Sequence, residues 1–335
     1  MDSISIIAGL FYGIKPAVTA IVFHATYRIG SRSLKNKFLW LIAAAAFIAI
    51  FFFNIPFPLI VFSAAILGYL LSKKQPHLFS QQASHQSNQK NYGAALIDDN
   101  TPPPAHAIFR WANLAKIVLI AAFLWCIPIL LLTFSLGWQH AYTQMAWFFT
   151  KAALLTFGGA YAVLPYVYQG AVNYYGWLNP TQMIDGLALG ESTPGPLIMV
   201  VAFVGFLGGF NQALLGAEHL FLAGAVGAVI VTWFTFLFSF VFIFAGAPLI
   251  ESTHNELKFT APLTAITAAV VGVILNLALF FSYHVLWPNG FDHAFNYEAA
   301  IITVAAMIAL FKFQINVLYV IFASALCGLI LYLFV

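Results

Sequence analysis

Formal charge is scarce in this chain. Only 7% of its 335 residues are Asp, Glu, Lys or Arg, whereas 62% are hydrophobic. A soluble globular protein carries about 25% charged residues, which keep its surface compatible with water. The composition therefore excludes a water-soluble domain and indicates a protein whose apolar surface faces lipid.

Other features are missing as well. The two cysteines, Cys126 and Cys327, lie in separate apolar runs, which excludes a disulfide scaffold and a cysteine-based metal centre. The net charge of +3 comes from scattered residues, so no basic patch points to nucleic acid. No Ser-His-Asp, HExxH, Walker or CxxC arrangement occurs, and we expect neither an enzyme nor a cofactor. The N-terminus lacks the basic region and cleavage site of a signal peptide.

Long apolar runs dominate what is present. Several approach or exceed the roughly 20 residues that a helix needs to cross about 30 Å of hydrocarbon. They do not alternate as the strands of a transmembrane barrel would. The sequence therefore predicts an all-α fold, a polytopic transmembrane helical bundle. The candidate spans are 8–28, 38–53, 55–72, 114–136, 142–168, 181–210, 219–249, 261–287, 298–313 and 315–333.

One polar segment interrupts these runs. Residues 73–113 are rich in Gln, Ser and Asn and include three consecutive prolines, which is typical of a flexible linker. If this linker is cytoplasmic, eleven of the thirteen Lys and Arg residues lie on the cytoplasmic side and the outer loops have none. The remaining two, Lys15 and Lys151, lie inside apolar segments.

The chain also contains an internal repeat. Residues 45–71 match residues 305–331 without gaps at eleven of 27 positions. The second copy has an even number of spans and one extra span precedes it, so the copies have opposite orientations. Inverted repeats of this kind, with broken helices near the bilayer midplane, are typical of secondary transporters. The front half of the second copy, 147–258, has no counterpart before residue 8, so we expect a first copy truncated at its N-terminus.

The repeat gives the expected domain organisation. We expect the C-terminal part of the first copy at 1–72, the flexible cytoplasmic linker at 73–113, a connecting transmembrane helix at 114–136 and the second copy at 142–335.

The span 181–210 contains a helix break. Its residues 190–196 read Gly-Glu-Ser-Thr-Pro-Gly-Pro, and Pro194 disfavours helical backbone at Thr193. We expect one helix to end near Gly190 and another to begin near Pro196, with its free amides and positive dipole end facing the break. That arrangement attracts anions.

A second break interrupts the span 142–168, where the paired glycines Gly158 and Gly159 permit unusual backbone conformations. Broken helices occur in a bilayer only where they are buried in protein or line a polar cavity. Two breaks in succession therefore predict a substrate site between them. The glycines and prolines could instead serve helix packing and kinking.

Charge favours the site. Glu191 costs at least about 2.5 kcal/mol inside a span, and such groups usually face a cavity or a partner. Lys151 lies two helical turns before Gly158, where it could attract an anion or pair with Glu191. The alternatives are that Lys151 extends to the interface and that Glu191 caps the second half-helix. Asp185 is expected near the cytoplasmic mouth. The predicted site residues are Lys151, Phe157, Gly158, Gly159, Glu191, Ser192, Thr193, Pro194, Gly195 and Pro196.

With FGGAYAVLPYV at 157–167 and GLALGESTPGPLIMVVAFVGFLGG at 186–209, the sequence resembles the chromate ion transporter family, specifically the second domain of its long, two-domain members. Residues 11–71 resemble the end of the first domain. The family signature falls on Phe157, Gly158, Gly159, Pro194, Gly195 and Pro196. Ala160 stands where a third glycine is common, and the signatures of the first domain are absent.

The resemblance implies a multi-pass exporter of chromate in a bacterial inner membrane that confers chromate resistance. We expect half-helix amides near Gly158 and Gly195 to bind the oxyanion, Lys151 to attract it, and Glu191 to couple protons or to repel backflow. The expected partners are chromate or a related oxyanion, the lipid bilayer, and either a homodimer mate or a protein that supplies the missing spans. A sulfate or other oxyanion transporter and an inactive or partner-dependent fragment remain as alternatives.

Overall fold

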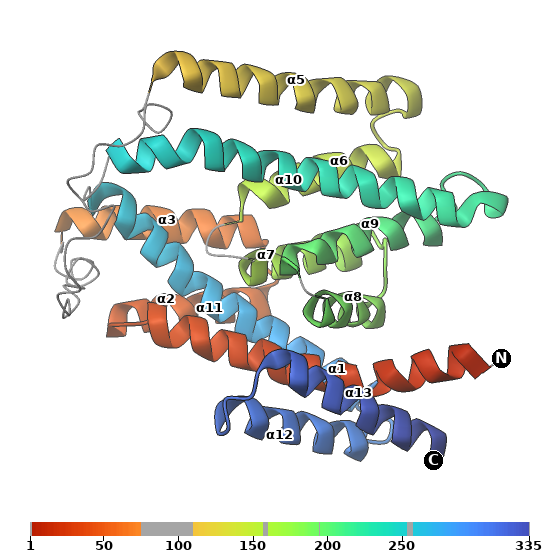
Figure 1. Ribbon diagram of the computed structural model, residues 1–335. Helices are drawn as coiled ribbons and strands as arrows, with labels where there is room; N and C mark the ends of the chain where they lie inside the picture. The colour runs from red at the N-terminus through yellow and green to blue at the C-terminus, as the bar shows by residue number, and fades with distance from the viewer. Residues whose placement is uncertain (1, 75–109, 157–159, 194, 253–256, 335) are drawn as a thin grey trace, which may run out of the picture.

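The computed structural model describes residues 2–74, 110–156, 160–193, 195–252 and 257–334, and within them the chain forms helices and no strand. Figure 1 shows α5 at one edge of the bundle and α12 and α13 at the other. The elements are α1 (Asp2–Ser33), α2 (Lys37–Phe53), α3 (Phe57–Lys74), α5 (Trp111–Leu136), α6 (Ala141–Leu154), α7 (Ala160–Tyr168), η1 (Gln169–Tyr174), α8 (Pro180–Ser192), η2 (Leu197–Met199), α9 (Val200–Asn211), η3 (Ala217–His219), α10 (Leu220–Ser252), α11 (Leu257–Leu286), α12 (Tyr297–Phe311) and α13 (Val317–Phe334).

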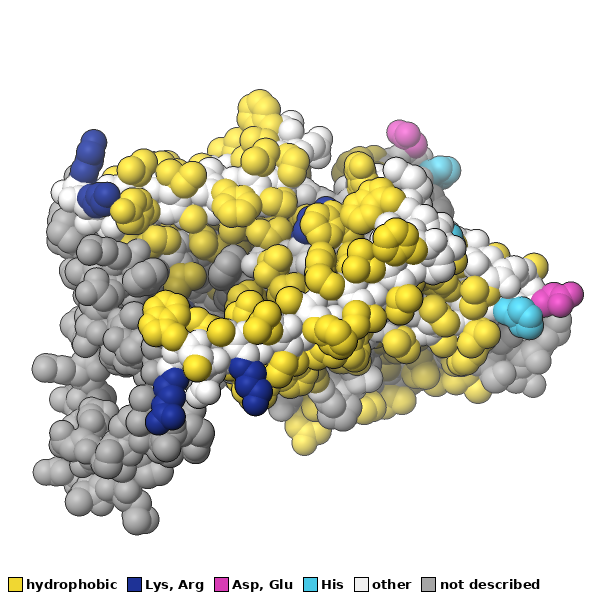
Figure 2. Space-filling model, turned by 90° about the horizontal axis from the view of Figure 1, so that it is seen from above, with side chains coloured by type: hydrophobic (Ala, Val, Ile, Leu, Met, Phe, Trp, Pro, Cys, Tyr) yellow, Lys and Arg dark blue, Asp and Glu magenta, His cyan; other side chains and the backbone are white. Residues whose placement is uncertain are grey.

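Five of the described helices are long and apolar enough to cross a membrane, namely α1, α3, α5, α10 and α11. In Figure 2 hydrophobic side chains cover most of the face that α5 and α10 form. Lys and Arg gather towards one end of this face, and acidic and His side chains lie at the other. The chain is therefore a multi-pass, all-α membrane protein, as the composition predicts.

The two repeated hairpins, α2–α3 and α12–α13, begin in the same way. The side chain of Asn36 accepts a hydrogen bond from the Leu39 amide at 2.9 Å, and that of Asn296 accepts one from the Ala299 amide at 2.9 Å. These N-caps occupy equivalent positions of the repeat, nine residues before the stretch in which the sequence similarity was found. Each satisfies an amide that the helix leaves free.

The turns of the two hairpins also match. Asn54 and Gln314 both adopt left-handed backbone, with φ of 50° and 51°. The Ile55 amide donates to the Ala49 carbonyl at 3.2 Å, and the Ile315 amide donates to the Ala309 carbonyl at 3.1 Å. In each hairpin this bond spans the left-handed residue and ties the turn back to the last turn of the preceding helix. Two hairpins of related sequence thus have the same caps and the same turn.

The hairpins are exchanged between the copies. Helix α1 directly precedes the hairpin α2–α3, and α11 directly precedes the hairpin α12–α13, so α1 and α11 are counterparts. Helix α1 packs against α12 and α13, whereas α11 packs against α2 and α3. The Tyr12 hydroxyl donates to Glu298 at 2.6 Å and the Thr303 hydroxyl donates to the Pro16 carbonyl at 3.3 Å, so α1 and α12 run in parallel. Since the Asn296 amide bonds the Leu286 carbonyl, α12 starts where α11 ends. Helices α1 and α11 therefore run in opposite directions, as an inverted repeat requires (Figure 1).

Glycine allows the exchanged helices to touch. A Cβ on Gly328 of α13 would lie 2.1 Å from the amide nitrogen of Gly13 in α1. A Cβ on Gly68, the equivalent residue of α3, would lie 2.8 Å from the Ala261 carbonyl oxygen in α11. Without a side chain, the backbones approach closely enough for van der Waals packing, which holds membrane helices together.

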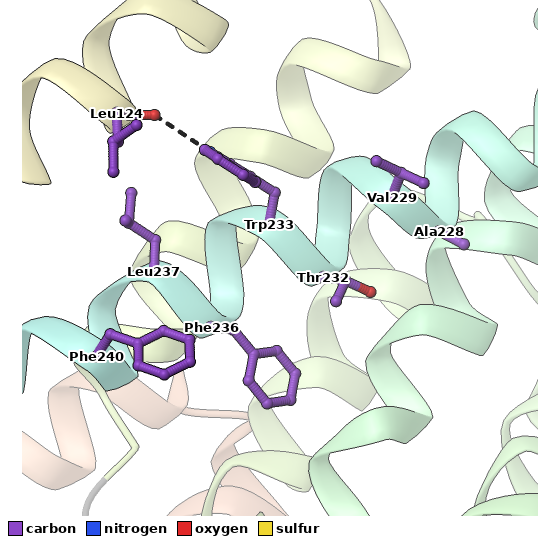
Figure 3. Close-up of a pocket in the computed structure, with 8 residues that line it drawn as sticks. All are labelled: Leu124, Ala228, Val229, Thr232, Trp233, Phe236, Leu237 and Phe240. Atoms are coloured by element: carbon purple, nitrogen blue, oxygen red, sulfur yellow. Dashed lines mark hydrogen bonds between the residues drawn. The ribbon is translucent and has the colours of Figure 1, made fainter. Parts of the chain in front are cut away.

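Helix α5 lies at the periphery, with Ile129 its one buried residue. Pro128 has no amide hydrogen, so the carbonyl of Leu124, four residues earlier, has no partner within the helix. The indole of Trp233 in α10 donates to this carbonyl at 3.2 Å, as Figure 3 shows. A second indole, that of Trp125, donates to the Thr150 hydroxyl of α6 at 3.0 Å. Two tryptophans thus attach α5, beside an apolar groove of about 510 Å³.

Candidate re-entrant substrate site

The segment 142–168 does not cross the bundle but turns back. The Tyr175 hydroxyl donates to the Gln144 side chain at 3.2 Å, and the Tyr166 ring stacks on Phe148 with centroids 4.8 Å apart. Gly170 also packs directly against the ring of Phe148. The chain after the break thus returns alongside α6 to the end where α6 began. We call α6, α7 and η1 the first hairpin.

The segment 181–210 turns back as well. The Asn211 amide group donates to the Gln182 side chain at 3.3 Å, Gly186 packs against the Phe203 ring, and Gly190 faces Leu197. These contacts pair the start of α8 with the end of α9. We call α8, η2 and α9 the second hairpin.

The prediction that 142–168 and 181–210 cross the bilayer is therefore wrong. Helices α6 and α8 have 14 and 13 residues, which gives each a length of roughly 20 Å against about 30 Å of hydrocarbon. The break in 181–210 lies where predicted, because α8 ends at Ser192 and the next helical turn begins at Leu197. The other break falls between the end of α6 at Leu154 and the start of α7 at Ala160. Two successive crossings return the chain to the side where it started, and so do two re-entrant hairpins. The orientation of the other helices is therefore unchanged.

The bases of both hairpins meet at Trp177. Its ring is buried and stacks on Tyr175 at 4.4 Å and on Phe149 at 6.1 Å. Its carbonyl accepts a hydrogen bond from Asn211 at 3.1 Å, and Gly208 of α9 packs against its side chain. The aromatic packing fixes the four helix ends that form this base.

The tips of the hairpins are joined by a polar contact. The hydroxyl of Tyr161, in the first turn of α7, donates a hydrogen bond to the carboxylate of Glu191, in the last turn of α8. The Glu191 carboxylate lies at the C-terminus of α8, where the helix dipole disfavours a negative charge. The N-terminus of α7 beside it favours a negative charge and so offsets this cost. Arg28 of α1 lies within electrostatic range of both residues. The site thus combines both breaks with a cation from the other repeat.

Glu191 is not the N-cap of the following half-helix. The cap residues of η2 and α9 are Pro196 and Met199, and neither start is capped by a side-chain hydrogen bond. The carboxylate is instead committed to Tyr161. Tyr161 stands inside the quoted glycine motif, but nothing in a chain with 14 tyrosines singled it out.

Two predicted hydroxyl donors are already in use. Ser192 and Thr193 donate to the Leu189 carbonyl at 3.1 and 3.0 Å. They end helix α8 in this conformation, so neither hydroxyl proton is directed to a ligand.

The rest of the break is open. Gly195 and Pro196 are exposed, and no atom lies within 4 Å of a Cβ built on Gly195. A ligand could therefore approach the backbone here without displacing a side chain. The predicted residues Phe157, Gly158, Gly159 and Pro194 lie outside the described residues.

Lys151 has a different neighbour from the one expected. Its ammonium group lies 5.7 Å from the centre of the Trp147 ring, and it makes no ion pair with Glu191. The interpretation of Lys151 as the partner of Glu191 is therefore wrong. Its role as a charge that attracts an anion stays a prediction.

An unexpected ion pair connects the two copies. Lys15 of α1 and Asp185 of α8 lie with Nζ and Oδ1 3.0 Å apart, and their side chains are 27% and 25% exposed. This is the one ion pair found within the described ranges. Lys15 stands out in the sequence as a charge inside an apolar segment, whereas Asp185 was expected near the cytoplasmic mouth. Matching these two opposite charges was the signal that could have paired them.

The chain is similar in sequence to known transport proteins. The family described as chromate transporter matches residues 2–69 and 143–329, which include the repeated hairpins and both re-entrant hairpins but omit α5. The chromate transport protein of Pseudomonas aeruginosa is 30% identical over 270 residues, 79% of this chain and 53% of that protein. The chromate transport protein of Cupriavidus metallidurans is 30% identical over 190 residues, 57% of this chain and 42% of that protein.

A shorter relative is covered almost completely. The uncharacterized transporter YwrA of Bacillus subtilis is 26% identical over 189 residues, 56% of this chain and 94% of that protein. Relative to the two chromate transport proteins, in contrast, this chain spans about half their length. No solved structure matches it. With a match over both repeated regions, the chain belongs to the chromate transporter family.

Proposed function

We propose that this chain is a secondary transporter that exports chromate across a bacterial inner membrane and binds it where the hairpin tips meet. The observation that carries the proposal is the Tyr161–Glu191 hydrogen bond, which brings both helix breaks to one place. Membership of the chromate transporter family supports chromate as the ion.

The chemistry of the tips suits an oxyanion. Helix α7 and the η2–α9 segment both start here, so their amides and positive dipole ends face the same space. Glu191 occupies this space as an anion tethered to the protein. A chromate dianion competes with it for the Tyr161 hydroxyl, and protonation of Glu191 releases that donor. Proton uptake by Glu191 is thus coupled to binding of the ion.

The distribution of charge supports export as the direction of transport. Arg28, which acts on the tips, belongs to the group of basic residues assigned to the cytoplasm. Chromate attracted by Arg28 comes from the cytoplasm, and this supports export as our proposal. The side chain of Lys151 adds a second positive charge to the end of α6.

Chromate efflux from loaded vesicles tests the proposal. Glu191→Gln and Tyr161→Phe should each lower the initial rate at least about tenfold, which corresponds to about 1.4 kcal/mol. Gly195→Leu adds its side chain to open space, so it should fold normally and block approach to the backbone. Matched controls are Glu218→Gln and Tyr174→Phe, which change exposed residues away from the tips. Wild-type efflux in all three site variants would dismiss this site.

Sulfate is the alternative cargo, because it shares the shape and charge of chromate. Labelled sulfate that competes for efflux and is itself exported at a similar rate would favour a general oxyanion transporter. A partner-dependent fragment is the alternative of another class. Purified chain in proteoliposomes that transports only after a longer family member is added would support a requirement for a partner.

A further inference from the structure

A cavity with several polar side chains in its wall lies beside η1, away from the hairpin tips. It has a volume of about 670 Å³, opens to the surface and is bordered by the end of α2, by α7 and η1, and by the second half of α11. Its polar lining comes from amide and hydroxyl side chains, chiefly Asn54, Tyr168, Gln169, Asn173, Asn276 and Tyr283. The described residues that line it include no carboxylate and no Lys or Arg.

The π-helical turn η1 shapes this cavity. It widens the end of the first hairpin and places Gln169 and Asn173, four residues apart, on the cavity wall. Such turns are rare and occur frequently at functional sites. The Gln169 Oε1 atom accepts the Phe57 amide at 3.1 Å. This bond fixes the orientation of the Gln169 amide and leaves its NH2 group as the free end.

Three further amides have no partner. The side chains of Asn54, Asn173 and Asn276 make no hydrogen bond to any described residue. Asn276 belongs to α11, whose neighbouring residues 273, 274, 277 and 278 are all buried apolar side chains. Asn54 and Asn173 are exposed and Asn276 is half-buried, so their amide groups are open to polar contents of the cavity.

We infer that this cavity is a second, uncharged binding site for the same tetrahedral oxyanion, filled through a hydrated entrance. Amide NH2 groups and phenol hydroxyls hold the ion as hydrogen-bond donors, and no carboxylate in the lining repels it. Pro165 of the lining lies one helical turn from Tyr161, so the cavity follows α7 towards the tips. The identity of the ligand rests on the proposed function. The observation that the amides are unpaired is independent of it.

Cysteine accessibility tests the site in the full chain in lipid nanodiscs, with Cys126 and Cys327 replaced by alanine. Ser282→Cys places a thiol on the cavity wall, and it should react with an anionic methanethiosulfonate. Ser63→Cys is the matched control, because that serine is exposed on the lipid-facing side of α3 and makes the same kind of hydrogen bond to its own helix. It should not react. Sulfate and molybdate, tetrahedral dianions that do not oxidise thiols, should protect Ser282→Cys.

Variants of the lining separate binding from folding. Asn276→Leu should raise the sulfate concentration needed for protection about tenfold or more, because a hydrogen bond to a charged ligand is lost. Gln212→Leu makes the same change at an exposed position outside the cavity and should leave protection unchanged. An unreactive Ser282→Cys, or a reactive one that neither ion protects, overturns the inference.

The two proposals fail separately, because protection is an equilibrium measurement that needs no transport. Chromate efflux without protection removes the cavity site and leaves the proposed function in place. Protection without efflux removes the proposed function and leaves the cavity site.

Discussion

The ion pair between Lys15 and Asp185 gives a quantitative prediction about how the second hairpin is attached to α1. At a separation of 3.0 Å the Coulomb attraction is about 5.5 kcal/mol with an effective dielectric constant of about 20. Loss of hydration by both charges offsets most of this energy. Removing one partner, however, leaves the other charge in place without compensation.

We therefore expect Lys15→Met and Asp185→Asn each to lower the free energy of unfolding by about 3 kcal/mol. This is the lower end of the range for breaking a buried ion pair, because both side chains are about a quarter exposed. The double variant should lie within about 1 kcal/mol of wild type. The assay is equilibrium unfolding in mixed dodecylmaltoside and SDS micelles, followed by tryptophan fluorescence.

The double-mutant cycle decides the outcome. Asp292→Asn, a neutralised acid in the exposed loop after α11, is the control and should add independently to Lys15→Met. The reasoning is refuted if Lys15→Met and Asp185→Asn also combine additively, because the two charges would then contribute nothing to each other.

Two further predictions concern helix packing. Trp233→Phe leaves the Leu124 carbonyl unpaired and should lower the free energy of unfolding by about 1–3 kcal/mol. In a Pro128→Ala background the residue 128 amide can donate to this carbonyl within α5. The same Trp233→Phe change should then cost much less in the same unfolding assay. Gly328→Val places a side chain against the backbone of Gly13, at 2.1 Å from the Cβ position, and should prevent a monodisperse peak in size-exclusion chromatography. A normal elution profile would contradict the close packing.

The sequence predicted the helical membrane fold and the position of the helix breaks, but not the direction of the chain after them. Proline and glycine at 194–196 show where helical hydrogen bonding stops. They do not show whether the next segment continues or returns. That choice depends on contacts such as Gly186 with Phe203 and Gly208 with Trp177, which pair residues from different helices.

Only part of the candidate site was predicted, because its contacts also join residues from different helices. Glu191 was identified because an ionised group inside an apolar span is costly. Its partner Tyr161 lies 30 residues away and has no such cost, so composition and spacing gave no signal for it. The Lys15–Asp185 pair depends on the packing of α1 against α8, which the sequence alone did not predict.

The exchange of hairpins between the two copies has a consequence for the integrity of the protein. Because α1 packs against α12 and α13 while α11 packs against α2 and α3, the repeated hairpin of each copy is held by a helix of the other copy. If the polypeptide is cut between residues 74 and 110, each fragment should expose the surfaces that the other normally covers. The fragments should regain a folded bundle only when they are co-expressed, in the manner of a complementing pair.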